Sequence, residues 1–425
     1  MAASYIVAIA CFFVALVSCE VVQENSPNLI ADSTSYDVLP PSKDPWYLAP
    51  VELAFSNPGD VVKLRESPGN LTSVLKNLKS STQMLYRTTT GQGFRKLPAH
   101  AVTTVLVPKK PDPLLKEAVS YQVPYESSCL DASPSYGLAT ASDSIPLDLL
   151  DRLLGLGWLV IVPDYEGTMA SFGAPRLAGF ATLDSIKAVS SVGMERFGLD
   201  PDFDVAIWGY SGGALATAWA HVLMKSYAVD MYICAVSIGG LPADILRMME
   251  INDGSAHSSL VFNAIAGLSN EYPELDQQVA LAAKRSGPFN VSAFAQVKTM
   301  STAQSRAHFA HHQTQIYVYH GMNDEVAPID DVDALVKKWC RVHRALLIFD
   351  SRFQPQVWYH RFILGDHQAV GEFGVDHTLE FFKKEFLYRR NKRDMEFSDH
   401  RFYCETRELT MVENSADLGE DEGPA

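Results

Sequence analysis

Residues 205–218 of this 425-residue chain read VAIWGYSGGALATA, and this stretch decides the fold. Its first four residues are apolar and favour a strand, and the alanine-rich part that follows favours a helix. Between them, residues 209–213 fit the pattern G-x-S-x-G, which places a serine on a sharp turn from strand to helix. Such a turn strains the backbone of Ser211, and glycines two residues before and after it avoid collisions. The stretch therefore predicts a serine nucleophile raised above the edge of a sheet.

The backbone N–H of Gly212 is the second element of this stretch. It lies at the start of the expected helix, where it could bind the oxyanion that forms when a serine attacks a carbonyl. The alternative is a glycine-rich loop with a surface serine. The strand character before Gly209 and the helix character after Gly213 favour the nucleophile.

Strand-like and helix-like segments alternate along most of the chain, which predicts an α/β fold, and the G-x-S-x-G turn within it is typical of α/β-hydrolases. Such a fold has a mostly parallel sheet with helices on both faces. We expect strands over residues 83–89, 102–107, 118–123, 159–164, 231–238, 316–319 and 345–349, and helices over residues 147–156, 179–192 and 381–393. The alternation breaks over residues 241–312, where the pattern is helical, and so long an insertion predicts a helical cap or lid.

The remaining boundaries divide the chain into a leader, a core and a tail. Residues 1–19 have an apolar run too short to span a bilayer, followed by small residues, and are predicted to be a signal peptide of a secreted, extracellular protein. A bacterial lipoprotein signal with Cys19 lipidated is the alternative. The core is expected over residues 20–240 and 313–393, and residues 394–425 form a C-terminal tail whose acidic end is predicted to be disordered.

Composition limits the classes of partner. The chain carries 35 basic and 50 acidic residues, and this net charge of −15 argues against nucleic acid, because phosphate binding needs a basic surface. It does not exclude a lipid–water interface, since interfacial binding can depend on apolar area. No phosphate loop or dinucleotide fingerprint is present, so no cofactor is expected. His308, His311 and His312 lack nearby cysteines or an HExxH pattern, so no metal is expected either.

Secretion makes disulfides and glycosylation relevant. Four cysteines lie beyond the predicted signal peptide: Cys129, Cys234, Cys340 and Cys404. They allow three pairings, and a Cys340–Cys404 disulfide is preferred because it would tie the tail to the core. Cys234 lies in an apolar run typical of a strand and is a candidate buried thiol; the pairing of Cys129 and Cys234 stays open. Asn70 and Asn290 lie in N-glycosylation sequons.

The acid partner of the serine should follow it in the chain and lie just after a strand. Asp324 meets both conditions, because it follows the expected strand 316–319. Glu325 is the nearest rival. We therefore predict Asp324 as the acid that orients the catalytic histidine.

The histidine should follow the acid, again beyond a strand. His367 lies in an expected loop that runs into a helix, after the expected strand 345–349. His360 and His377 are interpreted as structural. In the predicted mechanism His367 takes the proton of Ser211, the serine attacks an ester carbonyl, and water hydrolyses the acyl-enzyme.

With these residues in place, the chain resembles the fungal secretory lipase family, of the Candida antarctica lipase A type. The matching stretches occur in one order over most of the chain: residues 44–47 (DPWY), 86–89 (YRTT), 121–123 (YQV), 134–136 (PSY), 163–167 (PDYEG), 183–186 (LDSI), 209–213 (GYSGG), 320–328 (HGMNDEVAP) and 366–367 (DH). The resemblance implies an α/β-hydrolase with a helical cap and the triad Ser211, Asp324 and His367. It also implies that an acid after a tyrosine helps to form the oxyanion hole, and the matching residue is Glu126, where aspartate is usual.

The expected function is that of a secreted serine ester hydrolase, a lipase or esterase, acting on small-molecule or lipid esters. One alternative is an esterase that deacetylates a fungal secondary metabolite of the trichothecene type, which the short cap would favour. The other is a catalytically inactive hydrolase fold used for binding, against which the intact triad argues.

Overall fold

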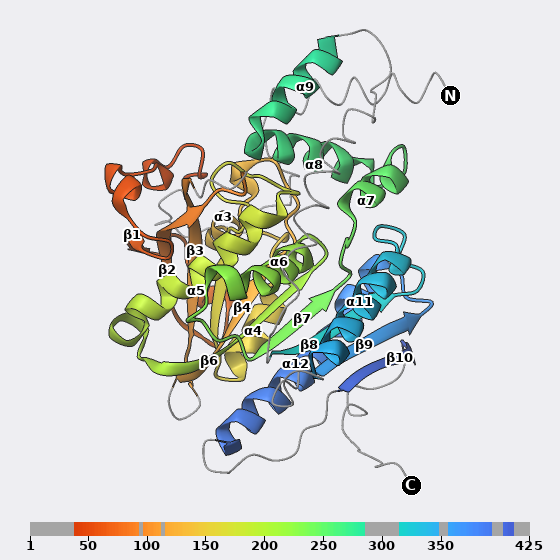
Figure 1. Cartoon of the computed structure of the whole chain (residues 1–425). Helices are drawn as coiled ribbons and strands as arrows, with labels where there is room; N and C mark the ends of the chain where they lie inside the picture. Colours follow the sequence, from red (N-terminus) through yellow and green to blue (C-terminus); the bar gives the residue numbers. More distant parts are fainter. Residues whose placement is uncertain are drawn as a thin grey trace, which may run out of the picture.

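The computed structural model describes residues 38–92, 97–111, 115–284, 314–347, 356–392 and 403–411, which form one ten-stranded sheet surrounded by helices (Figure 1). The strands lie in the order β1-β2-β3-β5-β4-β6-β7-β8-β9-β10. Their bounds are β1 (Val61–Glu66), β2 (Leu78–Thr89), β3 (Pro98–Pro108), β4 (Leu115–Gln122), β5 (Leu159–Pro163), β6 (Leu199–Tyr210), β7 (Ala235–Gly239), β8 (Gln315–Gly321), β9 (Gln356–Ile363) and β10 (Tyr403–Thr410). This is the mostly parallel α/β sheet that the sequence predicts.

The parallel part of the sheet determines where a site can form. Neighbouring strands are parallel from β5 through β4 to β10, whereas the pairs β1–β2, β2–β3 and β3–β5 are antiparallel. The register sets Tyr210 of β6 beside Gly239 of β7, and Gly239 beside Tyr319 of β8. The carboxyl ends of these strands therefore meet at one edge, where parallel sheets carry their ligand sites.

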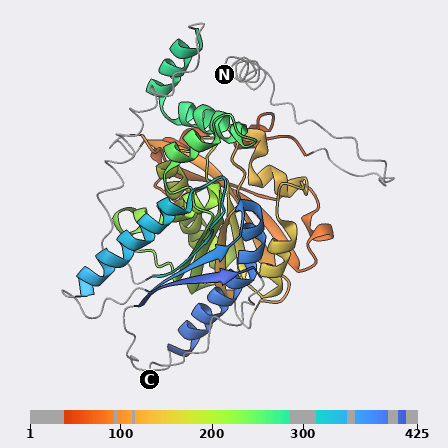
Figure 2. The ribbon, with the colours of Figure 1, turned by 90° about the vertical axis from the view of Figure 1, so that its right-hand side faces the viewer.

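Helices cover both faces of the sheet. Their bounds are η1 (Pro45–Tyr47), η2 (Val51–Phe55), α2 (Leu71–Val74), η3 (Leu130–Ala132), α3 (Pro134–Ala139), α4 (Leu147–Gly155), α5 (Pro175–Phe197), α6 (Gly212–Tyr227), α7 (Ile245–Asn252), α8 (Ser258–Glu271), α9 (Pro273–Lys284), α11 (Ile329–Leu347) and α12 (His367–Lys392). The apolar sides of α5, α6 and α11 pack on one face, and those of α3, α4 and α12 pack on the other. In Figure 2, α11 (light blue) and α4 (gold) lie on opposite sides of the strands. None of the helices in the described ranges is long and apolar enough to cross a membrane.

Helices α7, α8 and α9 follow β7 and lie beyond the carboxyl edge of the sheet (Figure 1). They have an apolar cluster of their own, which includes Met248, Ile265 and Leu268 and also takes in Phe172 from the loop before α5. Within residues 241–284 the structure contains helices and no strand, as the sequence predicts for this segment. The rest of the expected insertion, residues 285–312, lies outside the described residues.

The carboxyl-terminal third differs from the sequence prediction in three ways. Residues 345–347, expected in a strand, complete α11, because alanine and leucine continue a helix readily. His367 is the first residue of α12 rather than part of a preceding loop, and it follows β9, which was not predicted. Residues 403–410, expected in a tail, form the edge strand β10, whose alternating charged residues are typical of an exposed edge.

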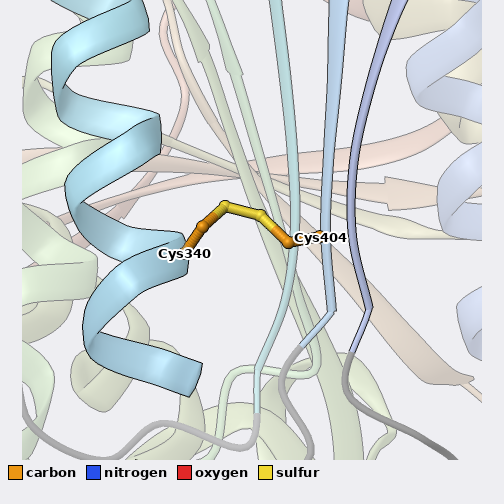
Figure 3. The surroundings of a disulfide bond; sticks show 2 residues. All are labelled: Cys340 and Cys404. Atoms are coloured by element: carbon orange, nitrogen blue, oxygen red, sulfur yellow. A yellow bond between two sulfur atoms is a disulfide. The ribbon is translucent and has the colours of Figure 1, made fainter. Parts of the chain in front are cut away.

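The disulfide expected between Cys340 and Cys404 is present and joins α11 to β10 (Figure 3). The two Cα atoms are 6.0 Å apart, and 64 residues separate the cysteines in the chain. The bond therefore fastens the edge strand to a helix on the same sheet, which gives this part of the predicted tail a fixed place in the core. Cys234 is a buried free thiol, and its Sγ donates to the carbonyl of Val205 at 3.2 Å.

Candidate active site

Ser211 lies at the turn between β6 and α6, where its backbone has φ 51° and ψ −121°. A positive φ is strained for a residue with a Cβ. A Cβ on Gly209 would lie 2.1 Å from the carbonyl oxygen of Gly213, and a Cβ on Gly213 would lie 2.0 Å from that of Gln122. Close backbone approach therefore requires glycine at both positions, as the G-x-S-x-G pattern predicts.

Three segments that are distant in the sequence bring their side chains together at this turn. The Oγ of Ser211 lies 2.9 Å from Nε2 of His367, and Nδ1 of the same ring lies 2.7 Å from Oδ2 of Asp324. The serine comes from the turn after β6, the aspartate from the loop after β8, and the histidine from the start of α12. Nδ1 donates to the carboxylate, which leaves Nε2 as the acceptor for the serine hydroxyl.

Electrostatics keep this arrangement ready for proton transfer. Burial alone raises the pKa of Asp324, but the hydrogen bond from His367, the electrostatic effects of the His367 and His320 rings and the backbone N–H of Ala327 together lower it below its usual value. Burial alone lowers the pKa of His367, but the hydrogen bond and charge of Asp324 outweigh it and raise the pKa. The aspartate is therefore ionised and the imidazole is a strengthened base.

The backbone of His367 is held on both sides. Its N–H donates to Oε2 of Glu325 at 3.1 Å, and its carbonyl accepts a hydrogen bond from the hydroxyl of Tyr210. The Tyr210 ring stacks on Tyr319, with ring centroids 5.9 Å apart. Sequence reasoning assigned no such contact to Tyr210, although it lies inside the G-x-S-x-G pattern between Gly209 and Ser211. Its position next to the serine is the signal that could have identified it.

The other candidates from the sequence lie elsewhere or make different contacts. Glu325, the rival acid, contacts the His367 backbone and not the imidazole. His360 is buried beside α12, and its Nδ1 lies 3.1 Å from the hydroxyl of Tyr317. His377 is buried in the same aromatic cluster, 5.7 Å from the His360 ring between centroids. Neither His360 nor His377 has a hydrogen bond to Ser211 or Asp324 in the described part of the chain.

Glu126 and Gly212, the two residues expected at an oxyanion hole, contact each other. The N–H of Gly212 donates to Oε1 of Glu126 at 2.9 Å. Glu126 adopts the left-handed conformation, with φ 46°, which turns its side chain toward the elbow. A Cβ on Gly212 would lie 2.8 Å from Cγ of Glu126, so the absence of a side chain at Gly212 makes room for the carboxyl group.

A second acid lies next to Glu126. Glu166 is fully buried, and burial, followed by the charge of Glu126, raises the pKa of its carboxyl well above the usual range. Its backbone N–H donates to the hydroxyl of Tyr125 at 2.9 Å. The segment that carries Glu126 therefore lies next to a neutral carboxylic acid, Glu166, whose backbone is hydrogen-bonded to Tyr125.

Two further expectations concern groups away from the triad. Among the residues that the structure describes, no group of three or more His, Cys, Asp or Glu side chains could hold a metal ion. His308, His311, His312, Asn290 and the leader lie outside those residues. Asn70 is exposed at the start of α2.

Comparison with known proteins identifies a family. A family model described as secretory lipase matches residues 133–316. Trichothecene C-3 esterase of Fusarium sporotrichioides is 36% identical over 361 residues, which cover 75% of this chain and 80% of that protein. Lipase 6 of Candida albicans is 32% identical over 354 residues, which cover 72% of this chain and 75% of that protein.

The fold also matches a solved structure. The closed state of Candida antarctica lipase A superposes with a TM-score of 0.70 over 82% of this chain and 87% of that one, at 24% identity. At this identity the match concerns the fold alone. It agrees with the α/β-hydrolase architecture expected from the G-x-S-x-G elbow and the family resemblance.

Proposed function

The chain belongs to the secretory lipase family and is an ester hydrolase, and on this premise we propose that it hydrolyses acyl esters through an acyl-enzyme formed on Ser211. The observation that carries this proposal is the continuous hydrogen-bonded series from Asp324 through His367 to the Oγ of Ser211. A serine, a base and an acid in this geometry form an activated nucleophile.

The reaction follows from the direction of these hydrogen bonds. Nε2 of His367 accepts the proton of Ser211 while Oγ attacks the ester carbonyl, and Asp324 stabilises the imidazolium that forms. The imidazolium then protonates the leaving alcohol, and the acyl-enzyme remains. A water molecule, deprotonated by His367, releases the carboxylic acid and restores the serine.

We assign the oxyanion to Gly212 and Glu126. The N–H of Gly212 lies at the amino end of α6, where the helix dipole favours negative charge. An ionised Glu126 would compete with the oxyanion for this N–H, whereas a protonated Glu126 could turn and donate a second hydrogen bond. A second hydrogen bond to the oxyanion therefore needs a donor at position 126.

Substitution of the serine tests the nucleophile. Ser211→Ala should lower kcat by about 10⁶-fold, because it removes the attacking oxygen. Labelling with a fluorophosphonate probe should disappear in this variant and persist in Ser185→Ala, where a buried serine that donates to Thr103 is lost instead. Absence of labelling in the folded wild-type protein would favour the third possibility, an inactive hydrolase fold used for binding.

A matched pair of variants tests Glu126. Glu126→Ala removes a hydrogen-bond donor and should lower kcat by about 10²–10³-fold. Glu126→Gln keeps a hydrogen-bond donor, so its kcat should stay within about 10-fold of the wild type. Pre-steady-state acylation of a soluble ester checks both. Equal losses in Glu126→Ala and Glu126→Gln would contradict the proposed role.

We propose that the described part of the expected insertion, helices α7, α8 and α9, forms a cap over the site. Three contacts support this: Phe172 packs among the cap helices and lies near Gly212, Glu271 of α8 accepts the N–H of Gly91, and Nδ2 of Asn270 donates to the carbonyl of Met169. The cap helices then line the route by which a substrate reaches Ser211, so we assign substrate selection to them.

Two substrate classes fit this site, and lipid esters are the first. The second is an ester of a trichothecene-type metabolite, which the 36% identity with trichothecene C-3 esterase favours. A series of p-nitrophenyl esters of increasing chain length, an emulsified triglyceride and an acetylated trichothecene separate the two. Activity confined to acetyl esters would contradict the lipid assignment, and inactivity on the trichothecene would contradict the second.

We also propose that the protein is secreted and works at a lipid–water interface. The Cys340–Cys404 disulfide and the exposed sequon at Asn70 support an oxidising compartment. Exposed apolar side chains at Val51 and Phe55 support contact with lipid. Initial rates measured across the solubility limit of a short-chain triglyceride test the interface: a rise above this limit supports it, and a rate set only by dissolved ester contradicts it.

A further inference from the structure

His320, the last but one residue of β8, is fully buried beside the candidate triad. Its Nε2 lies 2.9 Å from the carbonyl oxygen of Ala327 and 3.3 Å from Oδ2 of Asp324. The same Oδ2 accepts the hydrogen bond from His367. His320 therefore contacts the carboxylate oxygen that would hold the catalytic base.

The protonation state of His320 follows from its partners. Nε2 faces a carbonyl oxygen and a carboxylate oxygen, both of which are acceptors, so it carries the hydrogen. Nδ1 is buried and makes no hydrogen bond to the described residues. Burial lowers the pKa of His320 and outweighs the raising effects of Asp324 and the Ala327 carbonyl. The ring is thus neutral, and one N–H is shared between two acceptors.

The loop that carries Asp324 is closed by the same contacts. Oδ1 of Asp324 accepts the N–H groups of Val326 at 3.0 Å and Ala327 at 2.7 Å. The carbonyl of Ala327 in turn accepts from His320. The ring of His320, on the buried strand β8, therefore contacts Oδ2 of Asp324 directly and is connected to Oδ1 through the backbone of Ala327.

We propose that His320 is a positioning residue for ester hydrolysis, whose neutral Nε2–H holds Oδ2 of Asp324 in line with Nδ1 of His367. The inference rests on the proposed function, because it assigns the triad roles to Asp324 and His367. His320 does not touch the substrate; it acts through Asp324. A carboxylate with fewer donors binds an imidazolium more strongly, so the loss of His320 alters the basicity of His367 as well as its orientation.

The test compares two substitutions of His320 with a matched control. His320→Leu fills a similar volume without a donor, and His320→Gln keeps a neutral N–H at nearly the same reach. His360→Leu is the control, because His360 is equally buried on the neighbouring strand but hydrogen-bonds to Tyr317 rather than Asp324. Rates are measured with a soluble ester and normalised to the sites titrated by a fluorophosphonate, so that misfolded protein does not count.

We expect His320→Leu to lower kcat about 10- to 100-fold, the range that corresponds to one lost hydrogen bond to an ionised group, with KM nearly unchanged. The acid limb of its kcat/KM profile, which reports the ionisation of His367, should move to higher pH. The other titratable groups that act on His320 are His367, which lowers its pKa, and Asp333 of α11, which raises it, and both are present in all His320 variants. His320→Gln should keep kcat within about 3-fold of the wild type and restore the profile.

A purely structural role predicts a different result. His320→Leu and His360→Leu would then both lower the melting temperature, and neither would change kcat or the pH profile per titrated site. That outcome overturns the inference. If His320→Leu yields no titratable sites, His320→Asn takes its place, since its amide reaches the Nδ1 position only; equal profiles for the Asn and Gln variants would overturn the inference too.

The failure of the proposed function can be distinguished from the failure of this inference. Ser211→Ala and His367→Ala test the triad in the same assay. If both retain activity, the triad assignment fails and His320 has nothing to position. If both lose activity while His320→Leu behaves as the wild type, the triad stands and only the role of His320 is wrong.

Discussion

Asp324 and Asp184 are two aspartates shielded from water, and their surroundings favour opposite charge states. Asp324 accepts two backbone N–H groups and the N–H of His367, and its pKa is lowered although burial opposes this. Among the described residues, Asp184 of α5 accepts hydrogen bonds from the hydroxyls of Thr88 and Tyr227 alone, and burial raises its pKa to about 7. Burial thus favours the neutral acid, and a buried aspartate is a carboxylate at neutral pH where backbone donors and a partner that can carry positive charge surround it.

Asp164 belongs with Asp184. The carboxyl group of Asp164 accepts hydrogen bonds from the backbone N–H and the hydroxyl of Ser135, and this hydroxyl lies 2.8 Å from that of Tyr47. Burial raises the pKa of Asp164 to about 7. These residues come from the stretches 44–47, 134–136 and 163–167 on which the family resemblance was based. Those matching stretches are therefore joined by a buried hydrogen-bond network in the fold.

The same substitution at the two aspartates should separate their roles. Asp324→Asn should lower kcat/KM by about 10⁴-fold, because an amide no longer stabilises the imidazolium and favours the wrong tautomer of His367. Asp184→Asn should leave kcat/KM within about 2-fold, since an amide oxygen still accepts from Thr88 and Tyr227. Both are measured with a soluble p-nitrophenyl ester on protein whose fold is checked by circular dichroism.

Either of two results would remove this distinction. Asp324→Asn with more than a tenth of the wild-type activity would mean that the carboxylate charge is not needed. A loss in Asp184→Asn comparable to that in Asp324→Asn would mean that the hydrogen bonds of Asp184 to Thr88 and Tyr227 affect the catalytic residues.

The two regions also differ in how far the sequence predicts them. Ser211, Asp324 and His367 could be named from three signals: the fixed glycine spacing of the elbow, the chain order of its partners and the family resemblance. The strand expected before His367 was wrong, since residues 345–347 belong to α11 and His367 follows β9. The helices and central strands follow from apolar periodicity. The contacts of Asp164 and Asp184 could not be predicted, because no motif or chain order links these residues to their hydrogen-bond partners, which lie from 29 to 96 residues away in the chain.

The errors have a similar origin. The errors at residues 345–347, β9 and β10 arise because the conformation of each segment depends on the neighbouring segment that it contacts. β10 is a strand because β9 offers a free edge and Cys404 is joined to Cys340, and its own charged sequence resembles a tail. Local pattern contains no information about such partners.

The pH dependence of stability sharpens the comparison further. In the unfolded chain Asp184 ionises near its usual pKa, whereas in the folded protein it keeps its proton up to about pH 7. The stabilisation from this proton is therefore complete below about pH 4 and is lost as the pH rises through 7. In the Asp184→Asn variant this side chain cannot ionise. Between pH 4 and pH 8 its free energy of unfolding should therefore fall by about 1–3 kcal/mol less than that of the wild type.

Urea denaturation at a series of pH values measures this difference. The two curves should converge or cross near neutral pH, with the variant the more stable above it. Glu271 and Asp164, whose pKa values are also raised by burial to about 7, remain in both proteins and give them a shared decline. Identical slopes for wild type and variant would show that Asp184 is ionised in the folded protein at acid pH.

Glu117 is a further buried carboxyl group, and its substitution has the smallest expected effect. It accepts hydrogen bonds from Nε and Nη2 of Arg390 at 2.5 and 2.7 Å, so this part of the basic end of α12 is paired. Glu117→Gln should lower the free energy of unfolding by about 1 kcal/mol, because glutamine still accepts one hydrogen bond and the Arg390 side chain is partly solvated. Lys383→Gln breaks an exposed pair with Glu380 and should change it by less than about 0.5 kcal/mol. Equal losses of unfolding free energy in Glu117→Gln and Lys383→Gln, measured by urea denaturation, would mean that burial adds nothing to the ion pair of Glu117. A buried carboxylate would then need backbone N–H donors, like those that Asp324 has, as well as a charged partner.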